Sequence, residues 1–273
     1  MPQSHADEKG TRGLGDTPRS ANTSLAAGMP TMDSVVTDRL FNPPTAEGRA
    51  YRILRTAEVD PYDPPIAPAD VPAFGVAVVD TELAARPGDS FRGTSRKAAK
   101  LSIAEAPIEA LDDLPSLIAS LTPDGQMSSH HPPISDGPDS DRVDEEKRNI
   151  RVRAFLYAAS RENDNDFHLI IGSDRSAGPL KCMTMELSGL PPSRSRSYRR
   201  LKKTRDAYKA FFGSNLPGTS YDFYDPPIPV EIGGSLFFDI SHATGQKPGP
   251  SSLRPFIPTI WEVHPITRIV FEP

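Results

Sequence analysis

The sequence predicts a mainly β protein with one or two helices, preceded by a disordered N-terminal tail. Two observations predict this fold class. The second half of the chain contains short runs in which apolar and polar residues alternate, a spacing typical of half-buried strands. Thirty of the 273 residues are proline, about twice the ordinary share, which leaves less of the chain for regular structure.

The first half of the chain has the weaker pattern. Residues 1–45 are rich in Ser, Thr, Gly, Asp and Pro without an apolar period, so we expect a disordered tail. Residues 46–146 form a proline-rich region that is either weakly folded or packed on the C-terminal half. Its predicted elements are an apolar pattern at 49–63, a strand at 74–79, a helix or strand at 95–102, and a helix at 108–121 that Pro115 kinks or restarts.

Residues 147–273 carry the clearest elements. Residues 150–158 alternate as a strand, a polar turn follows, and residues 167–171 return as the second strand of a hairpin. The later elements are a strand at 182–187, a helix at 197–212, and strands at 228–239 and 260–271. The order of three strands, one helix and two strands matches an OB-like five-stranded barrel. A mixed sheet with one helix packed on it is the alternative.

Composition excludes several classes of protein. The net charge of −5 predicts neither a globally basic nucleic-acid binder nor an acidic tail protein. Cys182 is the only cysteine, so the chain forms no intrachain disulfide. No apolar run is long enough to cross a membrane and the N-terminus has no signal-like apolar region, so we expect a soluble cytoplasmic protein without membrane contact. An exported protein without a signal of this kind would look the same.

The turn of the predicted hairpin carries the most informative motif, an acidic row that leads into an apolar strand. Glu162, Asp164, Asp166 and His168 occupy alternate positions, and in extended structure they point to one face. Carboxylates crowded on one face repel each other unless a cation, a basic ligand or solvent relieves them. The row therefore suggests a site, while a solvated turn and a rim histidine are the alternatives.

Further acidic and histidine residues follow on later elements. Glu186 lies in the third strand, Asp239 and His242 end the fourth, and Glu262 and His264 share a face of the fifth. In an OB barrel the loop between strands one and two lies near the loop between strands four and five. We therefore expect the acidic row and the Asp239–His242 pair to meet at one mouth of the barrel, although a capping Asp239 and an edge-strand polar face are the alternatives.

These residues suit a divalent cation such as Mg²⁺, Mn²⁺ or Zn²⁺. Such an ion polarises a phosphoryl or carbonyl oxygen and activates water. The predicted metal ligands are Glu162, Asp164, Asp166, His168 and Glu186, and the predicted catalytic residues are Asp239, His242, Glu262 and His264. No metal motif of known spacing, such as HExxH or CxxC, supports the assignment.

A basic segment overlaps the predicted helix. We expect Arg199, Arg200, Lys202 and Lys203 to attract an anionic ligand, with interleaved aromatic residues available for stacking on bases. Tyr208, however, lies on the helix face that we expect to pack inward. A solvated basic helix face is therefore the alternative.

The acidic row, Glu186, the Phe238-Asp239-x-x-His242-x-x-Gly245 segment and the Glu262-x-His264-Pro265 box together resemble a group of uncharacterised bacterial proteins. That group carries an E-x-D-x-D-x-H-L row and a C-terminal E-L-H-P box; Val263 replaces the usual Leu here. The resemblance covers about residues 147–273. It implies that these residues form one constellation, and the group has no established activity to transfer.

The leading functional prediction is a metal-dependent protein that acts on, or holds, a phosphate-containing ligand such as nucleic acid. In its enzymatic version it is a metal-dependent hydrolase. One alternative is a non-catalytic barrel that binds nucleic acid through the basic helix. Another is a protein-interaction module that uses proline pairs, namely Pro64-Pro65, Pro132-Pro133 and Pro226-Pro227.

Overall fold

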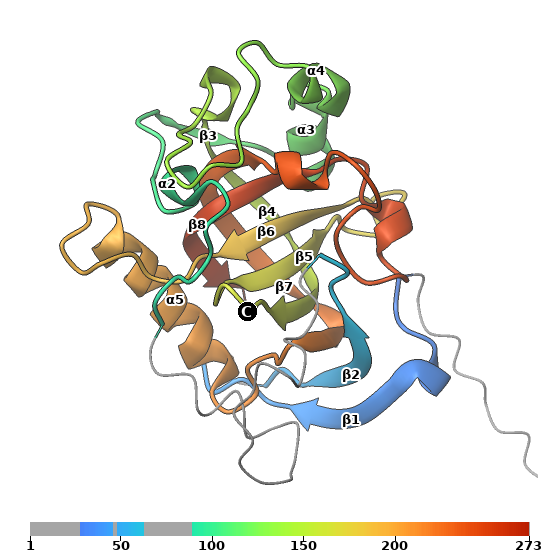
Figure 1. Cartoon of the computed structure of the whole chain (residues 1–273). Coiled ribbons are helices and arrows are strands. Elements are labelled where there is room, and N and C mark those ends of the chain that lie inside the picture. The colour runs from blue at the N-terminus through green and yellow to red at the C-terminus, as the bar shows by residue number, and fades with distance from the viewer. Residues whose placement is uncertain (1–27, 46–47, 63–88, 273) are drawn as a thin grey trace, which may run out of the picture.

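The computed structural model describes residues 28–45, 48–62 and 89–272, and these residues build one mainly β unit around an eight-stranded sheet (Figure 1). The strand order is β1-β2-β7-β8-β6-β5-β4-β3, with an additional β7–β4 pairing. The strands are β1 Val35–Phe41, β2 Tyr51–Val59, β3 Ile108–Ala110, β4 Asn149–Arg161, β5 Phe167–Gly172, β6 Cys182–Leu187, β7 Ser220–Phe238 and β8 Trp261–Phe271.

The described residues contain four α-helices, where the sequence led us to expect one or two. Three of them have six residues or fewer and carry little sequence signal. Single-turn 3₁₀ helices also occur in the connections. The helices are α2 Lys97–Lys100, α3 Leu114–Ala119, α4 Asp124–Ser128 and α5 Tyr198–Phe212, and the 3₁₀ helices are η1 Met32–Ser34, η3 Asp144–Glu146, η4 Ile240–His242 and η5 Arg254–Phe256.

The β7–β4 pairing closes a ring of five strands. β4 pairs with β5, β5 with β6, β6 with β8, β8 with β7, and β7 again with β4. Only the β6–β8 pairing in this ring is parallel. β1 and β2 extend the sheet from β7, and β3 runs parallel to β4. The strands and helix predicted for residues 147–273 are confirmed, except that β7 begins at Ser220 instead of residue 228.

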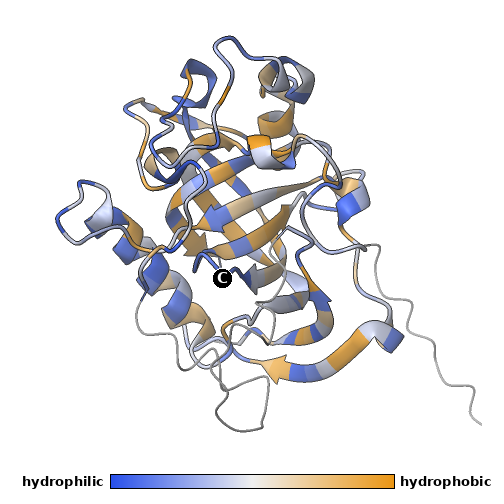
Figure 2. Cartoon of the chain, viewed as in Figure 1, coloured by the Kyte–Doolittle hydropathy of each residue, from blue (hydrophilic) through white to orange (hydrophobic). Residues whose placement is uncertain are grey.

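Alternation along the ring strands separates an inner face from an outer face. Leu156, Leu169, Met185 and Val263 belong to the main core cluster, which fills the ring. Their strand neighbours point the other way, and Ile170 belongs to a second apolar cluster outside. Figure 2 shows the resulting alternation of hydrophobic and hydrophilic residues along the strands. The period-2 pattern therefore decides which residues of β5, β6 and β8 lie on the outer face.

α5 packs its apolar side against the ring. The ring of Phe211 stacks on that of Phe271 at a centroid distance of 3.7 Å, and Phe212 lies 5.2 Å from Tyr224. The helix stops at Gly213, whose φ of 56° belongs to the left-handed region that glycine tolerates. Most basic residues of α5 consequently face away from the core, whereas Arg205 is buried.

The predicted disordered tail was too long, because it extended to residue 45. β1 pairs with β2 along its length, and Phe41 is buried between the rings of Phe211 and Phe212. The local sequence does not predict this strand, because a strand with a single buried aromatic residue looks polar. Tertiary contacts of Phe41 fix it in place. The apolar pattern at 49–63 forms β2. Residues 1–27 and the strand predicted at 74–79 lie outside the described residues.

Buried charged side chains of residues 89–146 bind this segment to the ring through hydrogen bonds with the backbone of β7 and β8. Arg96 donates to Glu146 through both terminal nitrogens, at 2.6 and 2.8 Å, and Glu146 Oε1 also accepts from the amide of Phe238 at 2.8 Å. Arg142 donates to the carbonyl of His264 at 2.7 Å and to that of Leu236. The described part of the proline-rich region is therefore packed on the ring rather than weakly folded.

The single helix predicted at 108–121 is wrong at its start. Residues 108–110 pair with β4, and the helix begins only after Asp113, whose carboxylate accepts the amide of Ser116 at 2.7 Å. Pro115 occupies the first turn of α3, where its missing N–H costs nothing. The proline therefore restarts a helix instead of kinking one.

β7 begins earlier than the sequence predicted and contains Pro226 and Pro227. The β4–β7 register shifts between Leu156 and Ala158, and this irregularity accommodates the proline pair within the ladder. These two prolines therefore lie within a strand of the sheet, Pro226 exposed and Pro227 half-buried.

Among the described residues, no helix has both the length and the apolar character needed to cross a membrane.

Candidate metal centre

The acidic and histidine residues gather on the outer face of β5, β6 and β8. His168 pairs with Glu186 across the β5–β6 ladder, and Thr184 pairs with Glu262 across the parallel β6–β8 ladder. Because inner and outer residues alternate, His168, Glu186, Glu262 and His264 all point away from the ring interior. All four are at most 2% exposed. We call these residues, with Glu162, Asp164, Asp166, Asp239 and His242, the acid–histidine cluster.

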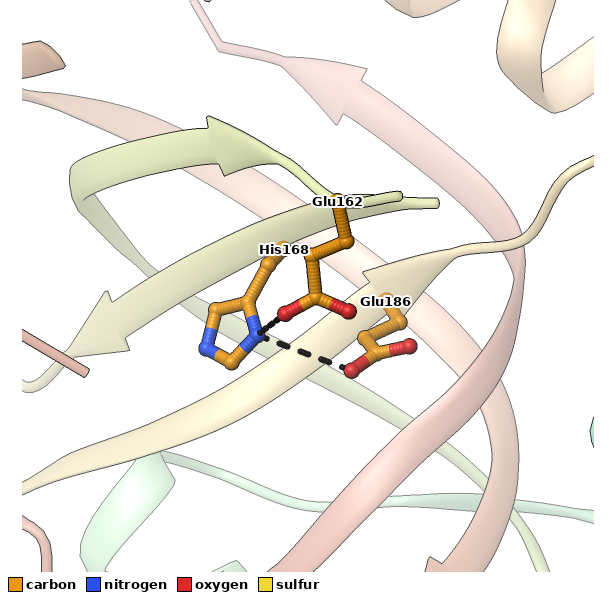
Figure 3. Close-up of side chains that lie close together, drawn as sticks. All are labelled: Glu162, His168 and Glu186. Atoms are coloured by element: carbon orange, nitrogen blue, oxygen red, sulfur yellow. Dashed lines mark hydrogen bonds and ion pairs between the residues drawn. The ribbon is translucent and has the colours of Figure 1, made fainter. Parts of the chain in front are cut away.

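The first group of the cluster surrounds His168 (Figure 3). Its Nδ1 lies 2.6 Å from Glu162 Oε1 and 3.6 Å from Glu186 Oε1. Its Nε2 points away from both carboxylates and makes no hydrogen bond. One imidazole nitrogen and two carboxylate oxygens therefore converge at this point.

The second group surrounds His264. Its Nδ1 lies 2.9 Å from Glu186 Oε2 and 3.6 Å from Glu262 Oε2, while its Nε2 lies 3.3 Å from Asp166 Oδ2. None of these contacts has the alignment of a hydrogen bond, and all of the participating atoms are buried without a hydrogen-bond partner. The atoms are close together but are not oriented to satisfy one another.

The third group lies near the cluster's rim, at η4. His242 Nδ1 is 3.9 Å from both Asp239 Oδ2 and Glu262 Oε1. Asp239 caps η4 by accepting the amide of Ser241 at 3.0 Å, so its predicted capping alternative is also correct. The ring of Tyr62, which is 36% exposed, lies 4.2 Å from the His242 ring. This is the side on which the cluster approaches solvent.

The acidic turn holds its shape through local hydrogen bonds. The amide of Glu162 donates to the carbonyl of Asp166 at 2.9 Å, and Asp164 Oδ1 accepts the amide of Asp166 at 3.0 Å. Asn165 adopts a φ of 80°, a left-handed conformation that asparagine tolerates better than most residues. Gly189 donates its amide to Asp166 Oδ1. The turn is therefore folded onto the cluster rather than solvated.

Burial and mutual repulsion shift the acidity of the carboxylates. Burial, together with repulsion from Asp164, raises the pKa of Asp166 to about 7. Burial and Glu186 likewise raise the pKa of Glu162 well above its ordinary value. The pKa of Glu186 shifts the other way: burial opposes its ionisation, but His264 and Lys100 outweigh burial and hold the pKa well below its ordinary value. Among Glu162, Asp166 and Glu186, Glu186 is thus the carboxylate that most strongly favours the ionised form.

The histidines respond to the same carboxylates. Burial disfavours protonation of His168, but attraction from Glu162, Asp60 and Glu186 outweighs it and raises the pKa to about 10. For His264, burial is again opposed by Glu186 and its neighbours, which raise the pKa well above the ordinary value. Without a metal ion, protons on the histidines therefore supply part of the positive charge that the carboxylates require.

Lys100 is the functional residue that sequence reasoning missed. It is 7% exposed, and its Nζ lies 4.0 Å from Asp239 Oδ2 and 5.7 Å from the centre of the Phe237 ring. Burial opposes its charge, but Glu186, Asp239 and the other nearby carboxylates raise its pKa well above the ordinary value. The Lys97–Lys100 stretch contains no local motif, so nothing in the sequence marks Lys100 as buried.

The structure joins all nine predicted acidic and histidine residues in one cluster, although the predicted division into ligands and catalytic residues does not follow the geometry. Glu186 contacts His264 as well as His168, and Glu262 contacts both His242 and His264. The predicted position is also different. The cluster lies on the outer face of three strands, and not at a mouth of the ring.

The predicted anion-binding residues stay apart from the cluster. Arg199, Arg200, Lys202 and Lys203 are all exposed on α5, and Lys202 pairs with Asp206 at 2.6 Å. The side chain of Arg205, also on α5, is instead buried and donates to Asp89 at 3.1 Å. The solvated-face alternative therefore describes most of this helix.

Arg200 also lines a groove of about 1580 Å³ between α2, the start of α5 and the ends of β4, β7 and β8. The basic residues along it outnumber the acidic ones. The basic lining residues are Lys97, Arg142, Lys147, Arg151, Arg196, Arg200 and Arg268, and the acidic ones are Glu105, Asp139 and Asp141.

Comparison with known proteins adds no identity: no family model, no curated protein and no solved structure matches this chain.

Proposed function

We propose that the protein binds divalent metal at the acid–histidine cluster and uses it to hold, or act on, a phosphate-containing ligand such as nucleic acid. One observation carries the proposal. Each of three histidines faces two carboxylates within 4 Å, and around His264 every contacting nitrogen and oxygen is buried without a hydrogen bond. Buried polar atoms are nearly always hydrogen-bonded, so a group of unsatisfied ones in one place supports a cation-binding site.

The donor set narrows the choice of metal. Imidazole nitrogen with carboxylate oxygen suits Zn²⁺ and other transition metals, whereas Mg²⁺ prefers oxygen ligands and retains several waters. The cluster is buried and offers one imidazole at each point, so we expect Zn²⁺ or Mn²⁺ to bind more tightly than Mg²⁺.

The topology supports a phosphate-containing ligand. We propose that the five-strand ring is an OB-like barrel, because its strands pair in the order first, second, third, fifth, fourth and then first again, with α5 between the third and fourth. OB-folds bind oligonucleotides and oligosaccharides on the face of strands two and three, between the loops that join strands one to two and four to five. Those strands are β5 and β6 here, and the loops carry Asp164 and His242.

In the enzymatic version of this proposal, bound metal polarises a phosphoryl oxygen and lowers the pKa of water. Among the described histidines, His242 is our candidate proton acceptor. Its Nδ1 makes no hydrogen bond, and it lies at the rim of the cluster beside Tyr62. Asp239 and Glu262 flank that nitrogen, each at 3.9 Å.

Metal binding is tested first. Protein stripped with a chelator is titrated with Zn²⁺, Mn²⁺ or Mg²⁺, and its melting temperature and bound metal are measured. Zn²⁺ and Mn²⁺ should stabilise the wild type, and His264→Ala should bind less metal. The matched control is Glu231→Gln, which removes a carboxylate that pairs with Arg268 outside the cluster. No bound metal and no stabilisation in the wild type would reject the proposal.

A second candidate, a nucleic-acid-binding barrel without catalysis, is favoured by the basic groove. Lys97 and Arg151 are exposed there, and together with Arg200 they offer a positive surface to a phosphate backbone. Binding of single-stranded DNA that is salt-sensitive but indifferent to chelator would favour this candidate over the metal-dependent one.

A further inference from the structure

The two oxygens of Glu186 face two different histidines. Oε1 lies 3.6 Å from His168 Nδ1, and Oε2 lies 2.9 Å from His264 Nδ1. A carboxylate that hydrogen-bonds one histidine has no need to present its second oxygen to another. This arrangement instead resembles a carboxylate that bridges two cations.

The spacing of the surrounding atoms fits coordination. Ligand atoms about 2.1 Å from a tetrahedral ion lie roughly 3.4 Å from one another. The contacts of His168 Nδ1 with Glu162 and Glu186 are 2.6 and 3.6 Å, and those of His264 Nδ1 with Glu186 and Glu262 are 2.9 and 3.6 Å. In the His168 group the three ligand atoms all lie within 4.8 Å of one another, so small adjustments would let them hold an ion. In the His264 group both carboxylate contacts of Nδ1 have lengths suited to coordination.

The His264 group gives stronger evidence of a bound ion than the His168 group does. His264 Nδ1, Glu186 Oε2 and Glu262 Oε2 are buried side-chain atoms without a hydrogen bond, on residues at most 2% exposed. On the other side of the ring, Asp166 Oδ2 lies 3.3 Å from Nε2. This contact is not aligned as a hydrogen bond, so the choice of Nδ1 as the ligand atom rests on its position between Glu186 and Glu262.

Charge and distance favour two ions over three. Four carboxylates contact His168 or His264, namely Glu162, Glu186, Glu262 and Asp166. They carry four negative charges when ionised, which two divalent ions neutralise. In the third group, both contacts of His242 Nδ1 are 3.9 Å, and Lys100 already supplies a cation beside Asp239. The third group is therefore looser and has its own compensation.

We infer that the cluster holds a pair of divalent ions bridged by Glu186, one bound by Glu162 and His168 and the other by His264 and Glu262. This inference rests on the proposed metal binding and deepens it. Paired ions about 3.5–4 Å apart are typical of phosphatases and nucleases, where they stabilise both the attacking and the leaving oxygen of an in-line displacement. The inference narrows the ligand class to phosphate esters.

The test is a titration of chelator-stripped protein with Mn²⁺, followed by metal analysis and electron paramagnetic resonance. The inference predicts two bound Mn²⁺ per chain and a spectrum of exchange-coupled ions. One ion, or two uncoupled ions, would overturn the bridge while leaving the proposed metal binding intact. No bound ion would overturn both.

Variants assign the two positions. His168→Ala and His264→Ala should each reduce the stoichiometry from two ions to one, with loss of the coupled spectrum. Glu231→Gln should retain both ions and the coupling. Two coupled ions in either histidine variant would overturn the assignment. If a variant does not fold, the wild-type stoichiometry and spectrum still decide the inference.

Discussion

Lys100 Nζ lies 4.0 Å from Asp239 Oδ2, although the two residues come from different halves of the chain. Lys100 ends α2, which the buried Arg96–Glu146 pair anchors to the backbone of β7 just before Asp239. The first half of the protein therefore supplies a cation to a cluster that otherwise belongs to the second half.

Replacing Lys100 by Met should destabilise the metal-free protein. The change leaves Asp239 and its neighbours as buried charges without their ammonium partner, and breaking a buried pair in this way costs about 3–5 kcal/mol. Added Mn²⁺ should recover part of the loss, because it replaces the missing positive charge. Urea denaturation with chelator and with Mn²⁺ measures both effects. The control is Lys97→Met in the exposed first position of the same helix, where we expect a change within about 0.5 kcal/mol. Equal losses in the two variants would contradict a role for Lys100 in the cluster.

The stability of the metal-free protein should fall as the pH rises above neutrality. Asp166 and His168 have folded-state pKa values of about 7 and about 10, both above their ordinary values. A raised pKa contributes stability that is complete below the unfolded pKa and is lost as the pH rises through the folded pKa. Melting temperatures in chelator should therefore decline from pH 6 to pH 10.

At acid pH the stability should change in the opposite direction, rising as the pH rises. Attraction from neighbouring cations outweighs burial at Glu186 and Asp239, and their lowered pKa values add stability that is lost as the pH falls below about 4. Stability should be greatest between these limits. His168→Gln should weaken the decline between pH 8 and 10. A flat profile from pH 6 to 10 would show that the cluster is not charged in the way described.

Charge reversal in the groove should weaken binding of single-stranded DNA. Lys97→Glu combined with Arg151→Glu places two negative charges where a phosphate backbone would lie, so we expect at least a tenfold loss of affinity at low salt. The slope of log K against log salt should also become shallower, by roughly 0.7 for each lost phosphate contact. Fluorescence anisotropy at several salt concentrations measures both.

The control for the groove is a pair of reversals elsewhere on the basic helix. Arg199→Glu with Lys203→Glu changes the net charge equally, and both residues are exposed but do not line the groove. The groove predicts a smaller effect for this control pair. A larger effect of the control pair would indicate that DNA binds the outer face of α5 instead of the groove.

Phe41→Ala should destabilise the protein by about 3–5 kcal/mol, the usual cost of truncating a buried phenylalanine. Phe41 is 1% exposed and packs against Phe211 and Phe212, so its loss opens a cavity under α5. Leu40→Ala is the matched control, because Leu40 is adjacent but 67% exposed. Chemical denaturation of both variants would also show whether β1 folds cooperatively with the ring. A neutral effect of Phe41→Ala would mean that β1 contributes little to the fold.

Local patterns in the sequence predict the strands of the second half and place the acidic row at a hairpin turn. Alternation predicts β4 and β5 correctly, but residues 162–166 form a turn rather than an extended segment, so only His168 of the row lies on a strand. The sequence also identified all nine members of the cluster, because carboxylates and imidazoles next to apolar strands stand out. It could not show that Phe41 anchors a strand, since a single buried aromatic residue has no period.

Only the tertiary structure decided how the cluster is arranged. The β5–β6 and β6–β8 registers place Glu186 between His168 and His264, and register depends on pairing between distant segments. The packing of residues 89–146 on the ring brings Lys100 to Asp239. These charged groups are separated by long stretches of chain, but they interact strongly only when they lie within a few ångströms of one another. Their charges therefore compensate one another only after the sheet has formed.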